Sequence, residues 1–126
     1  MANTLAPAAV NHVMNGSAKF WANINAQGTG DTQSSSFTPA ARDSFNLSSI
    51  TDHSTAQFTI AVSNNMANDD FAAIGNGTRS DTVGFVAQVI TPRLLTTSGF
   101  KFFCEYNNGN LWDFKNIFLS IIGDLA

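Results

Sequence analysis

Hydrophobic and polar residues alternate along much of this chain with a period of two. In residues 20–25 (FWANIN) the even-numbered positions are apolar, and the last two odd-numbered positions are asparagines. Residues 57–62 (QFTIAV) repeat the pattern, again with apolar residues at the even positions. This spacing puts apolar side chains on one face of an extended chain, as in a half-buried β-strand. We therefore predict strands over both segments.

Three further segments in the first two thirds of the chain are also predicted to be strands. Residues 43–50 fit one strand, because Phe45 and Leu47 alternate with polar residues. Residues 71–74 fit a short strand that ends at the Gly-Asn-Gly run of residues 75–77. Residues 83–90 are apolar on both faces and are interrupted by Pro92, so any continuation is expected to be an edge strand or a new element.

The last third of the chain predicts a hairpin. Residues 100–106 (FKFFCEY) alternate, and residues 107–110 hold an Asn-Gly pair of the kind that forms tight hairpin turns. Residues 112–122 are then expected to return as the partner strand. Together these segments predict an all-β fold, an antiparallel, jelly-roll-like β-sandwich of about seven or eight strands.

The domain organisation follows from where the alternation begins. Residues 1–18 show little periodicity and are interpreted as a short N-terminal arm or anchor, in which residues 8–14 fit one or two helical turns. Residues 19–126 form the predicted sandwich domain. A chain of 126 residues is one domain in size and long enough to bury a core without disulfides.

Composition adds two points to this picture. Only 12% of residues are charged, and the polar face is built largely from neutral Asn, Ser and Thr. Phe is over-represented, with 11 residues against one Tyr and two Trp. Because Phe needs no hydrogen-bond partner when buried, this excess predicts a core rich in aromatic packing, or such a core together with an apolar subunit interface.

Charge and segment length argue against several classes of partner. The net charge is −3 and the six basic residues are scattered, so we expect no nucleic-acid surface. No apolar run reaches the roughly 18 residues that cross a membrane, so we expect no membrane insertion. The first residues lack the pattern of a secretion signal, which predicts synthesis and use from the cytoplasm. The single cysteine, Cys104, excludes an internal disulfide.

The sequence contains histidines and aspartates, which can ligate metals, but they do not have the spacing of known metal sites. His12 and His53 are far apart and neither has a His or Cys at ligand distance in the sequence. Asp31, Asp69 and Asp70 do not follow the spaced acidic pattern of a calcium loop. We predict no metal site and interpret these residues as solvated loop residues.

Candidates for catalysis and cofactor binding are equally weak. Cys104 alternates with Phe102 and Tyr106, so it is interpreted as a buried structural thiol. The Gly-Thr-Gly run of residues 28–30 lacks the Lys-Ser/Thr ending of a phosphate loop. A glycosidase needs two carboxylates facing one sugar, whereas most of the nine acidic residues lie in predicted turns. We expect no catalytic residues, no cofactor and no enzyme activity.

The sequence leaves open whether the two tryptophans bind a ligand or pack inside the protein or its assembly. Trp21 lies on the polar side of its strand, and Trp112 follows the hairpin turn. An exposed tryptophan can stack on a sugar ring or anchor an interface, but tryptophans more often pack in a core or at a subunit contact. The binding residues stay unassigned at this point.

The sequence resembles a small virion domain of tailed bacteriophages over residues 19–66. The resemblance rests on residues 19–25 (KFWANIN), the Gly-Thr-Gly loop, residues 42–52 (RDSFNLSSITD), residues 57–60 (QFTI) and Met66. Residues 44–52 are the most specific part, and residues 67–126 match only loosely. In this family the domain is commonly the distal part of tail-fibre proteins, which are typically trimeric.

The resemblance implies a non-enzymatic structural protein of the virion, most simply a tail or tail-fibre appendage that contributes to host adsorption. The implied partners are other copies in a homotrimer, other virion proteins, and a host-surface polysaccharide or receptor. Residues 26–36 and 63–70 are the expected receptor-binding loops at the distal end. The family often has an Asn-Gly-rich turn where residues 53–56 (HSTA) lie here.

One departure from the family keeps a second interpretation open. Only 18 residues precede the domain, where a fibre protein would carry a long shaft. That difference favours a short appendage over a long fibre. The alternative is a head decoration protein that stabilises the capsid through its N-terminal arm.

Overall fold

The computed structural model describes residues 17–28, 37–81, 88–106 and 109–126, and these residues form β-strands and no helix. The all-β prediction is confirmed. Nine strands are found in the described residues, against the seven or eight expected. They are β1 (Ala18–Asn25), β2 (Ala40–Phe45), β3 (Leu47–Ser54), β4 (Gln57–Val62), β5 (Ala72–Thr78), β6 (Gln88–Thr96), β7 (Gly99–Tyr106), β8 (Asn110–Leu111) and β9 (Asn116–Ile122).

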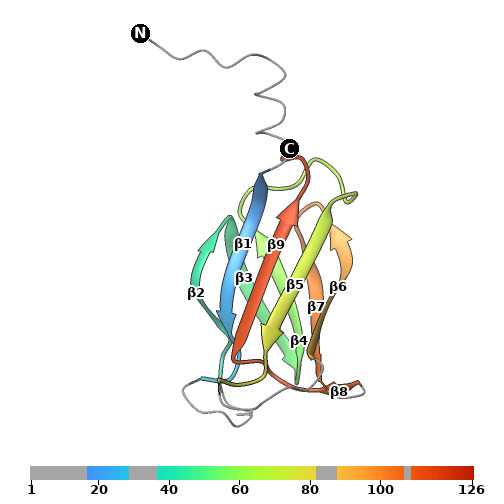
Figure 1. Ribbon diagram of the computed structural model, residues 1–126. Helices are drawn as coiled ribbons and strands as arrows, with labels where there is room; N and C mark the ends of the chain where they lie inside the picture. Colours follow the sequence, from blue (N-terminus) through green and yellow to red (C-terminus); the bar gives the residue numbers. More distant parts are fainter. Residues whose placement is uncertain (1–16, 29–36, 82–87, 107–108) are drawn as a thin grey trace.

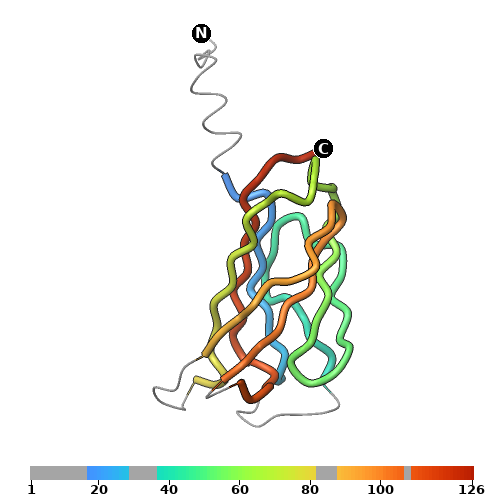
Figure 2. Tube along the Cα trace, turned by 90° about the vertical axis from the view of Figure 1, so that its right-hand side faces the viewer, coloured from blue at the N-terminus to red at the C-terminus, as the bar shows by residue number. Residues whose placement is uncertain are grey.

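The strands form two antiparallel sheets that lie face to face as a β-sandwich (Figure 1). Sheet A has the order β2-β1-β9-β5, and sheet B has the order β3-β4-β7-β6, with β8 paired to the end of β7. The chain runs back and forth along one long axis, which the turned view shows from the side (Figure 2). Each sheet therefore has one face on the core and one outer face.

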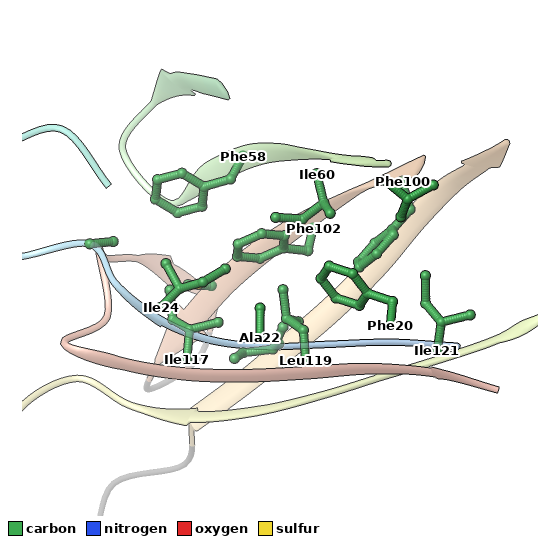
Figure 3. Close-up of a cluster of buried hydrophobic side chains, with 14 of the residues drawn as sticks. Phe20, Ala22, Ile24, Phe58, Ile60, Phe100, Phe102, Ile117, Leu119 and Ile121 are labelled. Atoms are coloured by element: carbon green, nitrogen blue, oxygen red, sulfur yellow. The ribbon is translucent and has the colours of Figure 1, made fainter. Parts of the chain in front are cut away.

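The core consists of the inward side chains of both sheets (Figure 3). The even positions of β1 and β4 point inward, as the alternation predicts. Phenylalanines from the two sheets meet there: Phe20 packs edge-on against Phe100 with ring centroids 5.8 Å apart, and Phe58 stacks on Phe102 at 5.1 Å. The many Phe side chains thus form much of the core. They pack the two sheets together and carry no polar group that would need a hydrogen-bond partner.

The strand predicted over residues 43–50 is in fact two strands in different sheets. The chain changes sheets at Asn46, whose φ is 61°, between the ends of β2 and β3. Asparagine tolerates this left-handed conformation better than most residues. A period-two pattern continues across such a corner, so the alternation alone could not reveal it.

The expected hairpin between residues 100–106 and 112–122 forms only at its first residues. Glu105 pairs with Leu111, but β9 then crosses to sheet A and pairs with β1 and β5. In that position Ile117, Leu119 and Ile121 face the core. The prediction of a partner strand for β7 over residues 112–122 was therefore wrong, because burial of this apolar face between β1 and β5 overrides the local turn signal.

The strand expected at residues 71–74 continues through the Gly-Asn-Gly run to Thr78. Gly75 and Gly77 lie on the inward side of β5, where Ile90 of β6 crosses over them. A Cβ on Gly75 would lie 2.5 Å from the Ile90 Cγ2 atom, and a Cβ on Gly77 would lie 2.4 Å from the Asn116 carbonyl oxygen. These glycines allow the two sheets to approach along this side and do not end the strand.

Strand β6 passes through Pro92 and lies at the edge of sheet B. Proline has no backbone N–H. An edge strand tolerates it because one side of the strand has no neighbouring strand that needs to accept a hydrogen bond. The prediction of an edge strand after Pro92 is thus confirmed. Residues 83–87 of the strand predicted over 83–90 lie outside the described residues, as do residues 1–16 of the predicted arm and its helical turns.

The sandwich has two distinct ends. The terminal end holds Ser17, residues 63–71, residues 97–98 and residues 123–126, and it lies at the top of Figure 1. The loop end is opposite and holds residues 26–28, 55–56, 79–81 and 109–115. Backbone bonds join each set: Met66 N–H donates to the Thr97 carbonyl (2.7 Å) at the terminal end, and Ala26 N–H donates to the Phe114 carbonyl (3.0 Å) at the loop end.

The two expected receptor-binding loops do not share one end. Residues 26–28 belong to the loop end and residues 63–70 to the terminal end, while residues 29–36 lie outside the described part. Three strands, β2, β3 and β4, separate the two loops in the chain. Because an odd number of antiparallel passes ends opposite its start, a common distal position is wrong.

Candidate functional site

An arginine between two aromatic rings is the most distinctive feature of the loop end. The guanidinium carbon of Arg79 lies 4.6 Å from the Tyr106 ring centroid and 4.7 Å from the Trp112 ring centroid. Both distances are within the range of cation–π attraction. We call these three residues the Arg79 cluster. All three are half-buried, so each keeps part of its surface at the loop end.

Strand ends from both sheets position the Arg79 cluster. Arg79 directly follows β5 of sheet A, and its N–H donates to the Gln88 side-chain oxygen at the start of β6. Tyr106 ends β7, and the Trp112 N–H donates to the Cys104 carbonyl (3.3 Å) just beyond β8. The Tyr106 and Trp112 rings meet edge-on with centroids 5.5 Å apart. This contact holds the two rings in place on either side of the Arg79 guanidinium.

A polar network lies beside the Arg79 cluster and holds residues 115–116 in place. Asp81 accepts from Lys115 Nζ at 2.8 Å and from Asn116 Nδ2 at 2.7 Å. The same Asn116 amide donates to the Thr78 hydroxyl at 2.9 Å. The Lys115 N–H also donates to the Arg79 carbonyl at 3.3 Å. The loop end is therefore neutralised locally and is ordered by its own hydrogen bonds.

Several polar groups of the loop end lack protein partners in the described part of the chain. These atoms are buried, and they are Gln27 Nε2 and Oε1, Arg79 Nε and Trp112 Nε1. Gln27 is 2% exposed, in a turn that Asn25 fixes by accepting from the N–H groups of Gln27 (2.9 Å) and Gly28 (3.1 Å). Buried polar groups are normally hydrogen-bonded, so these four atoms are candidates for water or ligand contacts.

Within the loop end, a buried carboxylate joins the segment 109–115 to the turn between β3 and β4. Asp113 accepts from the Ala56 N–H at 2.6 Å, and Ala56 has a left-handed φ of 62°. Burial raises the pKa of the Asp113 carboxyl; the Ala56 N–H opposes this and the nearby Asp52 carboxylate adds to it. Because its oxygen already binds the backbone, we assign Asp113 to holding this turn.

A shallow hollow lies near the terminal end, beside the outer face of sheet B. Its volume is about 320 Å³, and the side chain of Leu94, at a φ of 49°, stands exposed at its rim. Gly99 lines the hollow at a position where β7 lies close to the backbone of β4: a Cβ there would lie 2.0 Å from the Ile60 carbonyl oxygen. Lys101 is the one charged lining residue, and the other lining residues are apolar, among them Phe100, or carry hydroxyl groups.

The candidate residues from the sequence are not brought together. His53 is exposed on β3, with its Nε2 atom 2.7 Å from the Thr59 hydroxyl, whereas His12 and Asp31 lie outside the described residues. Asp69 and Asp70 are exposed at the terminal end. Among the described residues, no three His, Cys, Asp or Glu side chains gather to hold a metal, and no helix is long and apolar enough to cross a membrane.

Cys104 is a buried core residue, as predicted, and Gly28, the first residue of the Gly-Thr-Gly run, lies in a turn. The Cys104 thiol is fully buried on the inward face of β7, and burial raises its pKa, so it carries no thiolate for nucleophilic attack. Gly28 has a φ of 83° and contacts the Phe37 ring, while residues 29–30 lie outside the described part.

The two tryptophans lie in different surroundings. Trp21 is 39% exposed on the outer face of sheet A, so it is not a core residue. Trp112 packs partly against the core and belongs to the Arg79 cluster. Sequence reasoning identified Trp112 as a candidate and included Gln27 in the expected receptor-binding loop of residues 26–36, but it missed Arg79. The strand before Arg79 was expected to end at residue 74, and nothing in the local sequence placed two aromatic rings around the arginine.

The loop end offers two half-buried aromatic rings and a half-buried guanidinium, with the buried Gln27 amide beneath the surface. Such groups recognise neutral polar molecules, above all sugars, by ring stacking and hydrogen bonding. Comparisons with known proteins add no precedent for this arrangement. No family model, no curated protein and no solved structure matches this chain.

Proposed function

We propose that this protein is a non-enzymatic structural component of a tailed-phage virion, an appendage of the tail or tail fibre that contributes to host-surface adsorption. The sequence resemblance over residues 19–66 supports the virion assignment. The β-sandwich of the described residues suits a rigid surface part, since its polar groups are largely neutral Asn, Ser and Thr side chains that do not titrate near neutral pH.

The Arg79 cluster at the loop end is the observation that carries the adsorption proposal. Ser17 and Ala126 both lie at the terminal end, so a neighbouring virion protein attached through either would leave the loop end facing outward. The aromatic rings of Tyr106 and Trp112 and the Arg79 guanidinium then form the part presented to the host. We propose a host-surface polysaccharide as the ligand, bound by stacking and hydrogen bonds.

The competing role on the particle is decoration of the head. An immunogold label on intact particles separates the two roles. Label at the tail supports the proposal. Label over the whole head contradicts it in favour of capsid decoration, and protein found only free in the lysate contradicts any virion role.

Binding to the host surface is tested with the purified protein and host cells or extracted surface polysaccharide. Trp112→Phe and Arg79→Ala should lower binding at least several-fold, because each removes a stacking or donor group from the Arg79 cluster. Arg93→Ala is the matched control, since Arg93 stacks on Phe103 (5.0 Å) on the outer face of sheet B, away from the loop end. Equal binding by all three variants would contradict the site, and shortening of the polysaccharide would contradict the non-enzymatic role.

A further inference from the structure

Exposed large hydrophobic side chains gather on one face of the molecule. Nine are found in the described residues, and five of them share the outer face of sheet A. We call these five the apolar face; they are Trp21, Phe45, Ile74, Phe118 and Ile122, with exposed fractions of 38–55%. The other four are Val89, Leu94, Leu111 and Leu125, on other strands or at the chain end.

The strand register groups the apolar face around Ser120, with Asn23 and Asn76 on either side of Phe118. Trp21 of β1 is paired with Phe45 of β2 on one side and with Ser120 of β9 on the other, and Ser120 is paired with Ile74 of β5. One row of the sheet therefore reads Phe-Trp-Ser-Ile across all four strands. Phe118 and Ile122 lie two residues away from Ser120 along β9, on the same side. Such a cluster on a soluble domain marks an interaction surface.

The apolar face carries little charge. Arg42 and Asp43 lie together on the edge strand β2, where Arg42 donates to the Asn23 side chain (3.2 Å) and to the Lys115 carbonyl (2.9 Å). Lys19 is 9% exposed, with its ammonium on the Ser17 hydroxyl (2.9 Å). Two such faces meet without repulsion between like charges, whereas a charged partner would find no complementary group at the centre.

The size of sheet A matches a small specific interface. Four strands spaced about 4.8 Å apart and about seven residues long at 3.3 Å per residue give a footprint of about 440 Å². Two copies facing each other cover a total footprint of about 880 Å² before side chains are counted, close to the roughly 1,000 Å² that small specific interfaces bury. Sheet A is the front layer in Figure 1, and no other strand covers it there.

We propose that the outer apolar face of sheet A is where copies of this chain meet, sheet against sheet, in a closed homo-oligomer. The occupant of the face is therefore the same face of another copy. This inference rests on the exposed side chains alone, so it stands or fails independently of the virion role. The resemblance implies that copies of the chain associate, but it does not indicate which surface forms the contact. The apolar face is the surface that we propose.

The test is the mass of the full chain in solution, measured by light scattering with size-exclusion chromatography. Phe118→Lys puts a charge in the middle of β9, on the apolar face. Val89→Lys is the matched control, because Val89 is 51% exposed against 48% for Phe118 and lies on sheet B. A contact between two copies of the same face closes with two chains. We therefore expect two chains for the unchanged protein and for Val89→Lys, and one chain of 13.4 kDa for Phe118→Lys.

Two results would overturn the proposal. One is a single-chain mass for the unchanged protein at about 100 µM, which would also follow if residues 1–16 of the same chain covered the face. The other is an equal mass for both lysine variants. If Phe118→Lys does not fold by circular dichroism, Ile74→Gln tests the same face from the edge strand β5, where Ile74 is 55% exposed.

Discussion

Two inward positions of β5 are glycines because β6 crosses directly over them. Gly77 shows the constraint most sharply, since a Cβ there would meet the Asn116 carbonyl oxygen of the neighbouring strand at 2.4 Å and the Ile90 Cδ1 atom at 2.8 Å. Backbone cannot move aside as a flexible side chain can. The requirement at this position is therefore steric, and it comes both from β9 in the same sheet and from β6 in the facing sheet.

Gly77→Ala is predicted to lower the free energy of unfolding by about 1–3 kcal/mol, the usual cost of overpacking a core. Chemical denaturation monitored by circular dichroism measures it. Ala72→Ser, at an exposed position of the same strand, is the control and should change stability by less than about 0.5 kcal/mol. A Gly77→Ala protein as stable as the control would show that β5 lies farther from β9 and β6 than described.

The buried carboxylate of Asp113 predicts a dependence of stability on pH. Burial raises its pKa in the folded state above the ordinary value of about 3.8, so the folded protein binds the proton more tightly than the unfolded chain. The Asp113 contribution to stability is then most favourable below about pH 3.8. It declines as the pH rises toward the folded pKa, and stays low above it.

Asp113→Asn keeps an oxygen that accepts the Ala56 N–H but cannot ionise. The free energy of unfolding of the variant, relative to the unchanged protein, is therefore expected to be higher at pH 7 than at pH 3. Urea denaturation at both pH values measures this difference. Asp70→Asn, on an exposed residue, controls for the change in net charge. A relative stability that rises toward acid pH would contradict the assignment.

At the scale of the elements, Asn46 joins the two sheets on one side of the sandwich. Its side chain donates to the Lys19 carbonyl (2.9 Å) and to the Asn64 carbonyl (3.0 Å), and its Oδ1 atom accepts from the Asn64 N–H (2.7 Å). Its own carbonyl accepts from the Ser63 N–H at 3.1 Å. One side chain therefore fixes the β2–β3 corner to β1 and to the segment after β4.

Asn46→Ala removes four side-chain hydrogen bonds at a left-handed φ of 61°, and we expect a loss of about 2–4 kcal/mol of unfolding free energy. Asn46→Gly should recover the backbone part of that loss, roughly 1 kcal/mol, because glycine adopts this conformation freely. Thermal and urea denaturation of the two variants separate the terms. Equal stability of Asn46→Ala and the unchanged protein would contradict this role of the corner.

The alternation of the sequence could predict the strands but not how they pair. Residues 20–25 and 57–62 were found with the expected inward faces, because period two records burial directly. The alternation could not predict the sheet change at Asn46 or the crossing of β9 to sheet A. A strand shows the same alternation whichever strand it pairs with. The Arg79 cluster was missed for the same reason: its members are 27 and 33 residues apart and meet only through pairing.

For the whole molecule, the described surface has three different regions. The loop end carries the Arg79 cluster, the terminal end carries Ser17 and Ala126, and the outer face of sheet A carries the apolar face. Copies joined through sheet A lie side by side, so their loop ends stay uncovered. Self-association and host binding would therefore use separate surfaces, and several weak sugar sites could act together.

The two tryptophans allow this arrangement to be followed by fluorescence. Trp112→Phe leaves Trp21 on the apolar face as the sole tryptophan, and Trp21→Phe leaves Trp112 at the loop end. If copies meet through sheet A, dilution exposes Trp21 to water. We then expect its emission to shift to longer wavelength between about 100 µM and 1 µM, while Trp112 emission stays constant. Trp21 emission that stays constant while the mass falls would place the contact elsewhere on the molecule.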